Sequence, residues 1–238
     1  MKAKKIGAIL LASVMAVSMV PAMSVSAADA KRVCFVARAS SDTFAAWLTT
    51  EMKKQAEKYD DIELTCVSGE GDDNKENGLL EDCITKQYDL VIVQSNNNGA
   101  QAPYVQQLVD AGIPVIIVDR MVDVSDDSLY TAWVGSNFKL EGQKAMAWLD
   151  AYLEAKGRGD EEINLVDIQG TIGASAQIGR TEGFDEAVEA HDNWTTLAQQ
   201  SGEFTQAKGQ EVMESILKQS GDDIDVVYCE NDNEAFGA

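Results

Sequence analysis

The chain has 238 residues, of which 45% are hydrophobic and 25% charged, which is ordinary for a globular protein and too apolar for a disordered one. Asp and Glu number 40 against 19 Lys and Arg, so the net charge is −21 and the surface would repel nucleic acid, which we do not expect as a partner. The single histidine, His191, excludes chemistry that needs a histidine pair or a histidine-rich metal cage.

The first 28 residues have the composition of a secretory signal. A start with three lysines is followed by an apolar, uncharged run over residues 6–20, then Pro21 and the small-residue pattern Val25-Ser26-Ala27. We expect cleavage after Ala27 or Ala28 and an exported protein, in the periplasm or on the outer face of the cell membrane. A membrane anchor is the alternative, although the apolar run is short for a span.

From Lys31 onward, short apolar runs alternate with segments of helical periodicity. Val33–Ala37 is a continuous apolar run of the kind that is buried in a parallel sheet, and apolar residues then recur at helical spacing from Phe44 to Ala56. The further strands are expected, in chain order, over residues 62–67, 90–93, 115–118, 163–168, 195–199 and 224–229. The further helices are expected around residues 80–84 and 104–109, and over residues 139–156, 180–190 and 206–218.

This alternation predicts an α/β fold with parallel sheets and right-handed crossovers. Because the strands are too numerous for one small sheet, we expect two Rossmann-like lobes joined by a hinge, with Asp119–Gly135 crossing between them. The expected division is a signal peptide over residues 1–28, an N-terminal α/β lobe over 31–134 and an incomplete C-terminal α/β lobe over 135–238.

The four cysteines are not expected to form a chemical site. Export would permit disulfides, yet Cys34, Cys66 and Cys229 lie in apolar strand-like runs, so we expect buried free thiols. The chain has no C-x-x-C pair, which argues against a zinc ribbon or a thioredoxin-like centre. The glycines of residues 69–74 resemble a nucleotide loop, but the third glycine is missing and the acids there would repel phosphate, so we expect no cofactor.

Polar and aromatic residues follow the expected strands, where open parallel sheets bind their ligands. Carboxylates and amides accept hydrogen bonds from hydroxyl groups, arginines donate to oxygen, and aromatic faces cover the C–H face of a sugar ring, so this mixture suits a sugar. The candidate ligand-binding residues are Asp42, Phe44, Gln94, Asp119, Arg120, Arg180, Phe204 and Asn231.

Each candidate also has a purely structural interpretation, and the sequence leaves both open. Asp42 and the Asn231-Asp232 pair could cap helices, and Asp119 and Arg120 could form a surface ion pair. Arg180 could be a solvated helix residue, and Phe44 and Phe204 could belong to the core.

Four stretches resemble the type I periplasmic sugar-binding proteins, which are the ribose- and galactose-binding proteins of ABC importers. They are Val118-Asp119-Arg120, Gln169-Gly170 through Ser175-Ala176, Arg180–Phe184 and Asn231–Ala238, and the strand–helix order is similar over nearly all of residues 31–238. The resemblance implies the periplasmic binding protein-like I fold. It also implies a monomer that captures a monosaccharide, a hexose or a pentose, between its lobes for a membrane ABC permease.

The resemblance also assigns roles to the candidates by position. It implies a hydroxyl acceptor at Asp42, stacking rings at Phe44 and Phe204, amides at Gln94 and Asn231, an Asp-Arg turn at Asp119-Arg120, and a second-lobe arginine at Arg180. Ala45 stands where ribose binders commonly have an aromatic residue, and Arg158–Glu162 does not match the calcium loop of galactose binders, so no metal site is expected. The family continues beyond the Asn-Asp helix with further strand–helix units, so we expect a chain truncated at its C-terminus.

Two other functions remain as alternatives. A sugar-sensing ectodomain that serves chemotaxis or a histidine kinase would keep the same pocket and change only the partner. An exported glycosidase would use paired carboxylates, which are abundant here. Gly173–Gln177 lacks the second glycine of a nucleophile elbow, and only His191 could act as a base, so we expect a protein that is not an enzyme and has no catalytic residue.

Overall fold

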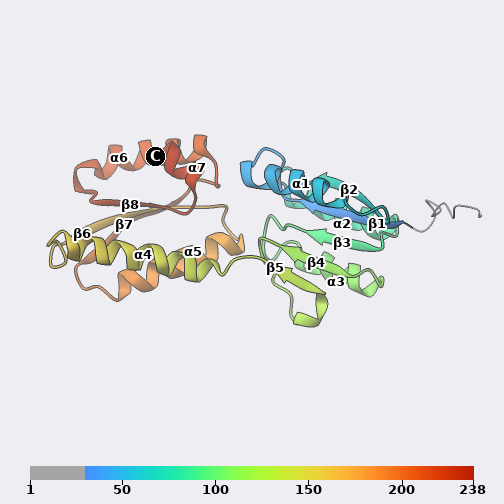
Figure 1. The fold of residues 1–238 in the computed structure, drawn as a ribbon. Coiled ribbons are helices and arrows are strands. Elements are labelled where there is room, and N and C mark those ends of the chain that lie inside the picture. The colour runs from blue at the N-terminus through green and yellow to red at the C-terminus, as the bar shows by residue number, and fades with distance from the viewer. Residues whose placement is uncertain (1–29) are drawn as a thin grey trace, which may run out of the picture.

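The computed structural model describes residues 30–238, which form two parallel β-sheets placed end to end (Figure 1). One sheet has the strand order β2-β1-β3-β4-β5 and the other the order β7-β6-β8, and every neighbouring pair is parallel. The predicted α/β fold with parallel sheets is therefore confirmed. The predicted signal over residues 1–28 lies outside the described residues.

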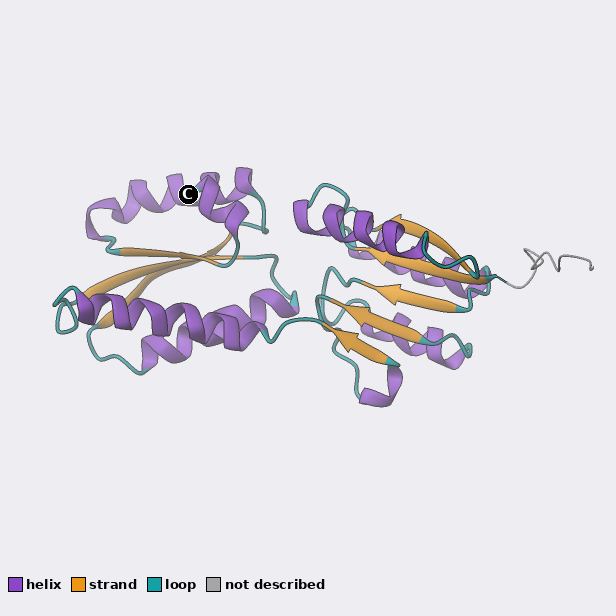
Figure 2. Cartoon of the chain, in the orientation of Figure 1, coloured by secondary structure: helices purple, strands orange, loops and turns teal. Residues whose placement is uncertain are grey.

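The N-terminal half is a sheet covered on both faces by helices (Figure 2). Helix α1 packs on the face that carries Phe35 and Val118, and helices α2 and α3 pack on the face that carries Val36 and Val91. The elements are β1 (Lys31–Ala37), α1 (Thr43–Ala56), β2 (Ile62–Ser68), α2 (Asp73–Thr85), β3 (Leu90–Val93), α3 (Ala102–Asp110), β4 (Val115–Val118), a 3-10 turn (Asp127–Leu129) and β5 (Ala132–Val134).

The C-terminal half repeats this three-layer plan around its own sheet. Helices α4 and α5 lie on one face, where Leu165 meets Met146 and Phe184, and α6 lies on the other, where Ile168 meets Met213. The elements are α4 (Phe138–Ala155), β6 (Ile163–Gln169), α5 (Ser175–Glu189), β7 (Trp194–Ser201), α6 (Gln206–Ser220), a 3-10 turn (Gly221–Asp223), β8 (Val226–Cys229) and α7 (Asp232–Gly237).

The structure corrects three details of the predicted elements. Asp119–Gly135 is not simply a crossing, because β5 within it pairs with β4 and extends the first sheet. Helix α5 begins at Ser175, five residues before the predicted start at Arg180. Strand β8 begins at Val226, two residues after the predicted start, because Ile224 and Asp225 only connect it to the 3-10 turn at Gly221–Asp223.

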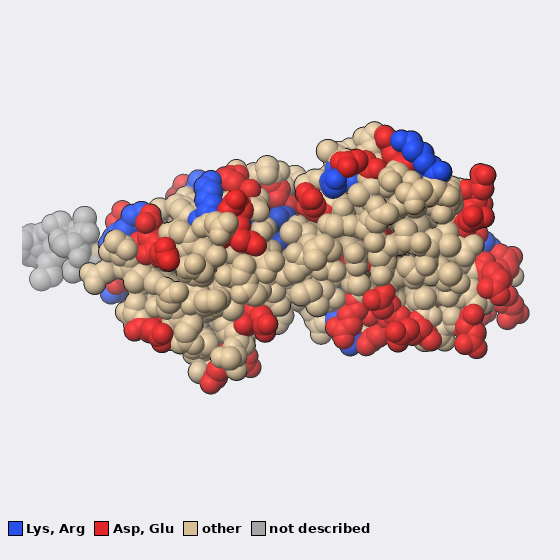
Figure 3. Space-filling model, turned by 180° about the vertical axis from the view of Figure 1, so that it is seen from behind, with Lys and Arg blue, Asp and Glu red and all other residues tan. Residues whose placement is uncertain are grey.

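The surface reflects the acidic composition. Figure 3 shows acidic side chains spread over one face of both halves, with far fewer basic ones. All four cysteines are free thiols; Cys34 and Cys83 are buried together in one core cluster, while Cys66 and Cys229 are half-buried. Between residues 30 and 238, no helix combines the length and apolar character that a bilayer crossing needs.

Helices α4 and α5 approach each other through glycines. A methyl group on Gly142 would come within 2.5 Å of the carbonyl oxygen of Arg180, and one on Gly183 within 2.6 Å of the backbone nitrogen of Gln143. The absence of side chains at these points brings α5 against α4. This contact holds Arg180 beside Glu141, a pair that belongs to the site described below.

We expect Gly183→Ala to destabilise the protein even though alanine favours helices, because the new methyl group has no room between α4 and α5. The free energy of unfolding in urea should fall by about 1–3 kcal/mol. The matched control is Gly78→Ala on α2, where nothing lies within 4 Å of the added methyl group, and it should gain about 0.5–1 kcal/mol. Equal changes in the two variants would contradict close packing at Gly183.

Candidate functional site

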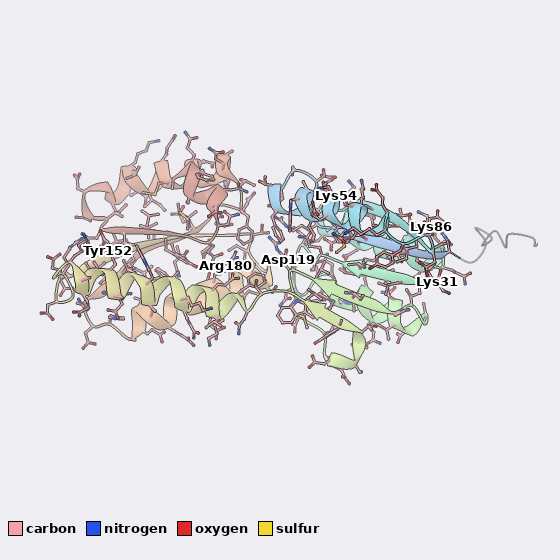
Figure 4. The ribbon with its side chains drawn as sticks, in the orientation of Figure 1. Lys31, Lys54, Lys86, Asp119, Tyr152 and Arg180 are labelled. Atoms are coloured by element: carbon pink, nitrogen blue, oxygen red, sulfur yellow. The ribbon has the colours of Figure 1, made fainter. Side chains whose placement is uncertain are left out.

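A cavity of about 570 Å³ lies where the two halves meet. Its size is within the range of about 300–1,000 Å³ common for small-molecule sites. Figure 4 shows Asp119 and Arg180 close to each other at the junction, one on each half. The residues that line the cavity are Arg38, Asp42, Thr43, Phe44, Asp119, Arg120, Ser136, Phe138, Glu141, Ala176, Arg180, Phe204, Asn231, Asp232, Asn233 and Phe236.

The first wall of the cavity is the end of β1 and the start of α1. The Asp42 carboxylate accepts a hydrogen bond from the backbone N–H of Ala45 at 2.7 Å, which makes Asp42 the N-cap of α1. Its other oxygen forms an ion pair with Arg38, and both side chains are almost completely buried. Asp42 is therefore a helix cap and a cavity residue at once, so its two interpretations are compatible.

The second wall is the turn after β4. Asp119 has a φ of +61°, in the left-handed region, and its backbone N–H donates to the carbonyl of Val134 at 2.8 Å. Arg120 is only 4% exposed, and its Nε lies 4.0 Å from Oδ2 of Asp119. Burial, aided by the charge of Arg38, lowers the pKa of Arg120 to about 9, so the guanidinium is still cationic near neutral pH.

Arg180 supplies the third guanidinium, from the second turn of α5. Its Nη2 and Nε donate to Oε2 of Glu141 on α4, at 2.9 and 3.1 Å. The guanidinium also stacks over the ring of Phe138, 5.0 Å from the centroid. Arg180 is thus a fixed residue of the cavity wall and not a freely solvated one.

Phe204 is the aromatic residue at the centre of the site. It has a φ of +60° and is 3% exposed, with Arg120 over its ring at 4.8 Å and Arg180 at 6.0 Å. A methyl group on Gly170 would lie 1.9 Å from the ring, so only glycine at this position, directly after β6, leaves room for the Phe204 ring. Phe44, in contrast, is 49% exposed and stacks beside Trp47, which leaves its ring available at the cavity rim.

The two halves touch around the cavity. Nδ2 of Asn233, in α7, donates to Oγ1 of Thr43 at the start of α1, at 3.2 Å. On the other side, the backbone N–H of Met121 donates to Oγ of Ser175 at 2.8 Å. Asn231 caps α7 through its Oδ1 and donates from Nδ2 to the carbonyl of Phe204 at 3.2 Å. The cavity walls are therefore connected across the junction and to one another.

The structure brings seven of the eight candidate residues to this one cavity. They are Asp42, Phe44, Asp119, Arg120, Arg180, Phe204 and Asn231. Gln94 is the exception: its side chain is fully buried and its Nε2 donates to Oδ2 of Asp119 at 2.9 Å, so it supports Asp119 from behind. Gln94 thus lies behind the cavity wall and not among the residues that line it.

Several lining residues were missed by the sequence analysis. Arg38 directly follows β1, so the rule that placed candidates after strands could have found it. Glu141 and Phe138 lie in the first turn of α4, shortly after β5, a strand that the sequence analysis did not expect. Thr43 and Asn233 begin helices on opposite sides, and only the packed structure pairs them.

The Arg120 side of the cavity rests on a buried glutamate. Oε2 of Glu76, in α2, accepts the backbone N–H of Asn96 at 3.1 Å, and Nη1 of Arg120 donates to the carbonyl of the same residue at 3.1 Å. Glu76 is completely buried, and burial raises the pKa of its carboxyl to about 8. It therefore holds a proton in the folded state near neutral pH.

Comparison with known proteins assigns nearly all of the described chain to one protein family. A family model described as a periplasmic binding protein domain matches residues 33–238. The galactofuranose-binding protein YtfQ of Escherichia coli is 34% identical over 194 residues, which cover 80% of this chain and 58% of that relative. The ribose import binding protein RbsB of Salmonella typhimurium is 28% identical over 225 residues, covering 94% of this chain and 72% of that relative.

Solved structures show the same likeness. The crystal structure of a galactofuranose binding protein matches with a TM-score of 0.80 at 32% identity, over 87% of this chain and 69% of that one. A periplasmic binding protein of the arabinose ABC transporter from Shewanella, bound to L-arabinofuranose, matches with a TM-score of 0.78 at 30% identity, over 87% and 67%.

We expect Glu76→Gln to change how stability depends on pH. Because the folded-state pKa of Glu76 lies above its unfolded value, the folded protein binds the extra proton between these values, and stability falls as pH rises from about 4.5 to 8. Glutamine still accepts the hydrogen bond from the Asn96 N–H but does not ionise, so its stability should not fall in this way. Relative to the parent, the free energy of unfolding of the variant should therefore increase by about 2–4 kcal/mol between about pH 5 and pH 8.5. Urea unfolding at several pH values measures the difference.

The matched control is Glu63→Gln at an exposed position of β2, whose stability curve should run parallel to that of the parent. A constant offset between Glu76→Gln and the parent at every pH would show that Glu76 ionises normally in the folded protein.

Proposed function

The chain belongs to the periplasmic binding protein family, and on this premise we propose that it captures a neutral monosaccharide, of furanose or ribose-like type, between its two halves. The observation that carries the proposal is the cavity of about 570 Å³ at the junction, which is lined from both halves by aromatic rings and polar groups. A ligand that contacts both walls favours the closed arrangement over the open one, which couples binding to closure.

The charges of the cavity support a neutral ligand. Each guanidinium has a carboxylate partner: Arg38 has Asp42, Arg120 has Asp119, and Arg180 has Glu141. A carboxylate on the ligand would compete with these acids for the arginines, and an ammonium would compete with the arginines for the acids. Hydroxyl groups can accept from the guanidiniums and donate to the carboxylates without breaking any pair.

The proposal extends to the location and the partner of the protein. We propose that it is exported after removal of the signal over residues 1–28 and that the closed, loaded form delivers its sugar to a membrane ABC permease as a monomer. The family and the ribose import relative support this role, and binding without turnover distinguishes it from an exported glycosidase. Loss of uptake in a strain lacking the protein distinguishes transport from sensing.

A sugar panel tests the proposed function by isothermal titration calorimetry. We expect one or more of D-galactose, L-arabinose, D-ribose and myo-inositol to bind with a Kd of about 1–10 μM. D-galacturonate and D-galactosamine should bind at least about 100-fold more weakly than D-galactose. The charge of either ligand would be buried without a partner, because the arginines and acids of the cavity are already paired with each other. No binding by any neutral sugar of the panel would refute the proposal.

Removal of the second-half arginine should weaken binding of the panel sugar. Arg180→Ala loses a charged donor to the ligand and leaves Glu141 unpaired, so Kd should rise by about 10–100-fold. The matched control is Arg158→Ala, which breaks an arginine–glutamate pair with Glu161 in the same half but outside the cavity and should leave Kd unchanged. Equal Kd values for both variants would show that Arg180 does not touch the ligand.

A further inference from the structure

Two buried glutamates lie on either side of Asn231, and the binding role proposed above does not use them. Glu230 follows β8 and Glu234 lies in α7; they are 4% and 0% exposed. We infer that Glu234 and Glu230 are positioning residues that fix the Phe204 ring in the cavity. Glu234 holds the backbone of Phe204, and Glu230 holds the backbone of Gly170, against which the ring packs. This inference rests on the proposed function, because it assigns the ring a role in sugar binding.

Glu234 holds the backbone of Phe204 itself. Its Oε1 accepts the N–H of Phe204 at 2.8 Å, and this is the residue whose φ is +60°. A phenylalanine in the left-handed region is strained, so this conformation persists only where contacts hold it. A hydrogen bond from the backbone to a charged acceptor supplies such a contact.

The chain leaves room for Glu234 at two glycines. A methyl group on Gly202 would come within 2.9 Å of Oε1 of Glu234, and one on Gly209 within 2.9 Å of its Cα. The loop before α6 therefore packs closely against the Glu234 carboxylate, and the first turn of α6 packs against the Glu234 backbone. The second carboxylate oxygen of Glu234, Oε2, is buried and has no hydrogen-bond partner among residues 30–238.

Glu230 holds the opposite side of the seat. Its Oε2 accepts the N–H of Gly170 at 2.7 Å, and its Oε1 accepts the hydroxyl of Thr181 at 2.7 Å. Gly170 is the position against which the Phe204 ring packs with no space for a methyl group. One carboxylate thus fixes the backbone that carries the ring, and the other fixes the backbone that the ring touches.

Protonation should loosen this arrangement. Burial raises the pKa of Glu234 and that of Glu230 to about 7 each, with the hydrogen bonds of Phe204 and Gly170 opposing the rise. The charged and titratable groups around Glu234 are Cys229 at the end of β8, Glu230 directly after it, Arg180 from α5 and Asp167 from β6. The neighbouring loop adds the exposed Glu203, and α6 adds the half-buried Lys208, which is paired with Glu211.

Amide NMR of the 15N-labelled, ligand-free protein tests the inference with crossed controls. Between about pH 8 and pH 6, the Phe204 amide proton should move upfield as Glu234 is protonated, and the Gly170 amide proton should do so as Glu230 is protonated. Glu234→Gln should abolish the Phe204 titration and keep that of Gly170. Glu230→Gln should do the reverse.

Sugar affinity provides the second readout, with D-galactose as the probe. The Kd of the parent should rise by about 3–10-fold from pH 8 to pH 6, and the double variant Glu230→Gln with Glu234→Gln should lose this pH dependence. Glu234→Gln should keep Kd within about 3-fold at pH 8, since its carbonyl still accepts the amide, while Glu234→Ala should raise Kd by at least about 10-fold.

The outcomes separate this inference from the function on which it rests. A Phe204 amide that titrates unchanged in Glu234→Gln, or a D-galactose Kd unaltered by Glu234→Ala, would overturn the positioning role. If D-galactose and the other panel sugars all fail to bind, the proposed function fails, and the amide titrations still decide whether Glu234 holds Phe204.

Discussion

The junction between the two halves depends on how it accommodates three arginine guanidinium groups that are wholly or partly removed from water. A cation removed from water is tolerated only beside an acid and with its N–H groups satisfied. Arg38 and Arg120 are buried and Arg180 is half-buried, and each lies beside an acid: Asp42, Asp119 and Glu141 respectively. The six residues come from four different elements or turns. Because the pairs converge from both sheets, they define a polar cavity at a place where packing alone would have produced an apolar interface.

The geometry of parallel sheets explains why these groups can converge. The carboxyl ends of β1, β3 and β4 lie at one edge of the first sheet, and those of β6, β7 and β8 lie at the edge of the second sheet that faces it. The turns at these edges depart from regular backbone: Asp119 and Phe204 both have positive φ. Strained backbone concentrated at the cavity, and held by specific hydrogen bonds, is the pattern expected of a site whose geometry matters more than its stability.

Buried acids form a second layer behind the cavity. Glu76 supports the backbone that Arg120 contacts, while Glu230 and Glu234 support Gly170 and Phe204. All three have a raised pKa because burial disfavours the carboxylate, so their ionisation competes with the fold. Each of these carboxylates accepts a hydrogen bond from a backbone N–H group at or behind the cavity wall. Burying them costs stability, but the hydrogen bonds hold the backbone of the site in place.

The sequence by itself determined the succession of strands and helices and the parallel sheets, because continuous apolar runs and helical spacing are local signals. The family was inferred separately, from the resemblance of four short stretches. The sequence also determined most of the cavity, since candidates such as Asp119 and Asn231 follow strands. Only the tertiary structure decided that Gln94 lies behind Asp119, that Glu141 pairs with Arg180, and that Gly170 seats Phe204. Those contacts join residues distant in the chain, and their existence depends on how two sheets and their helices pack, which no local pattern encodes.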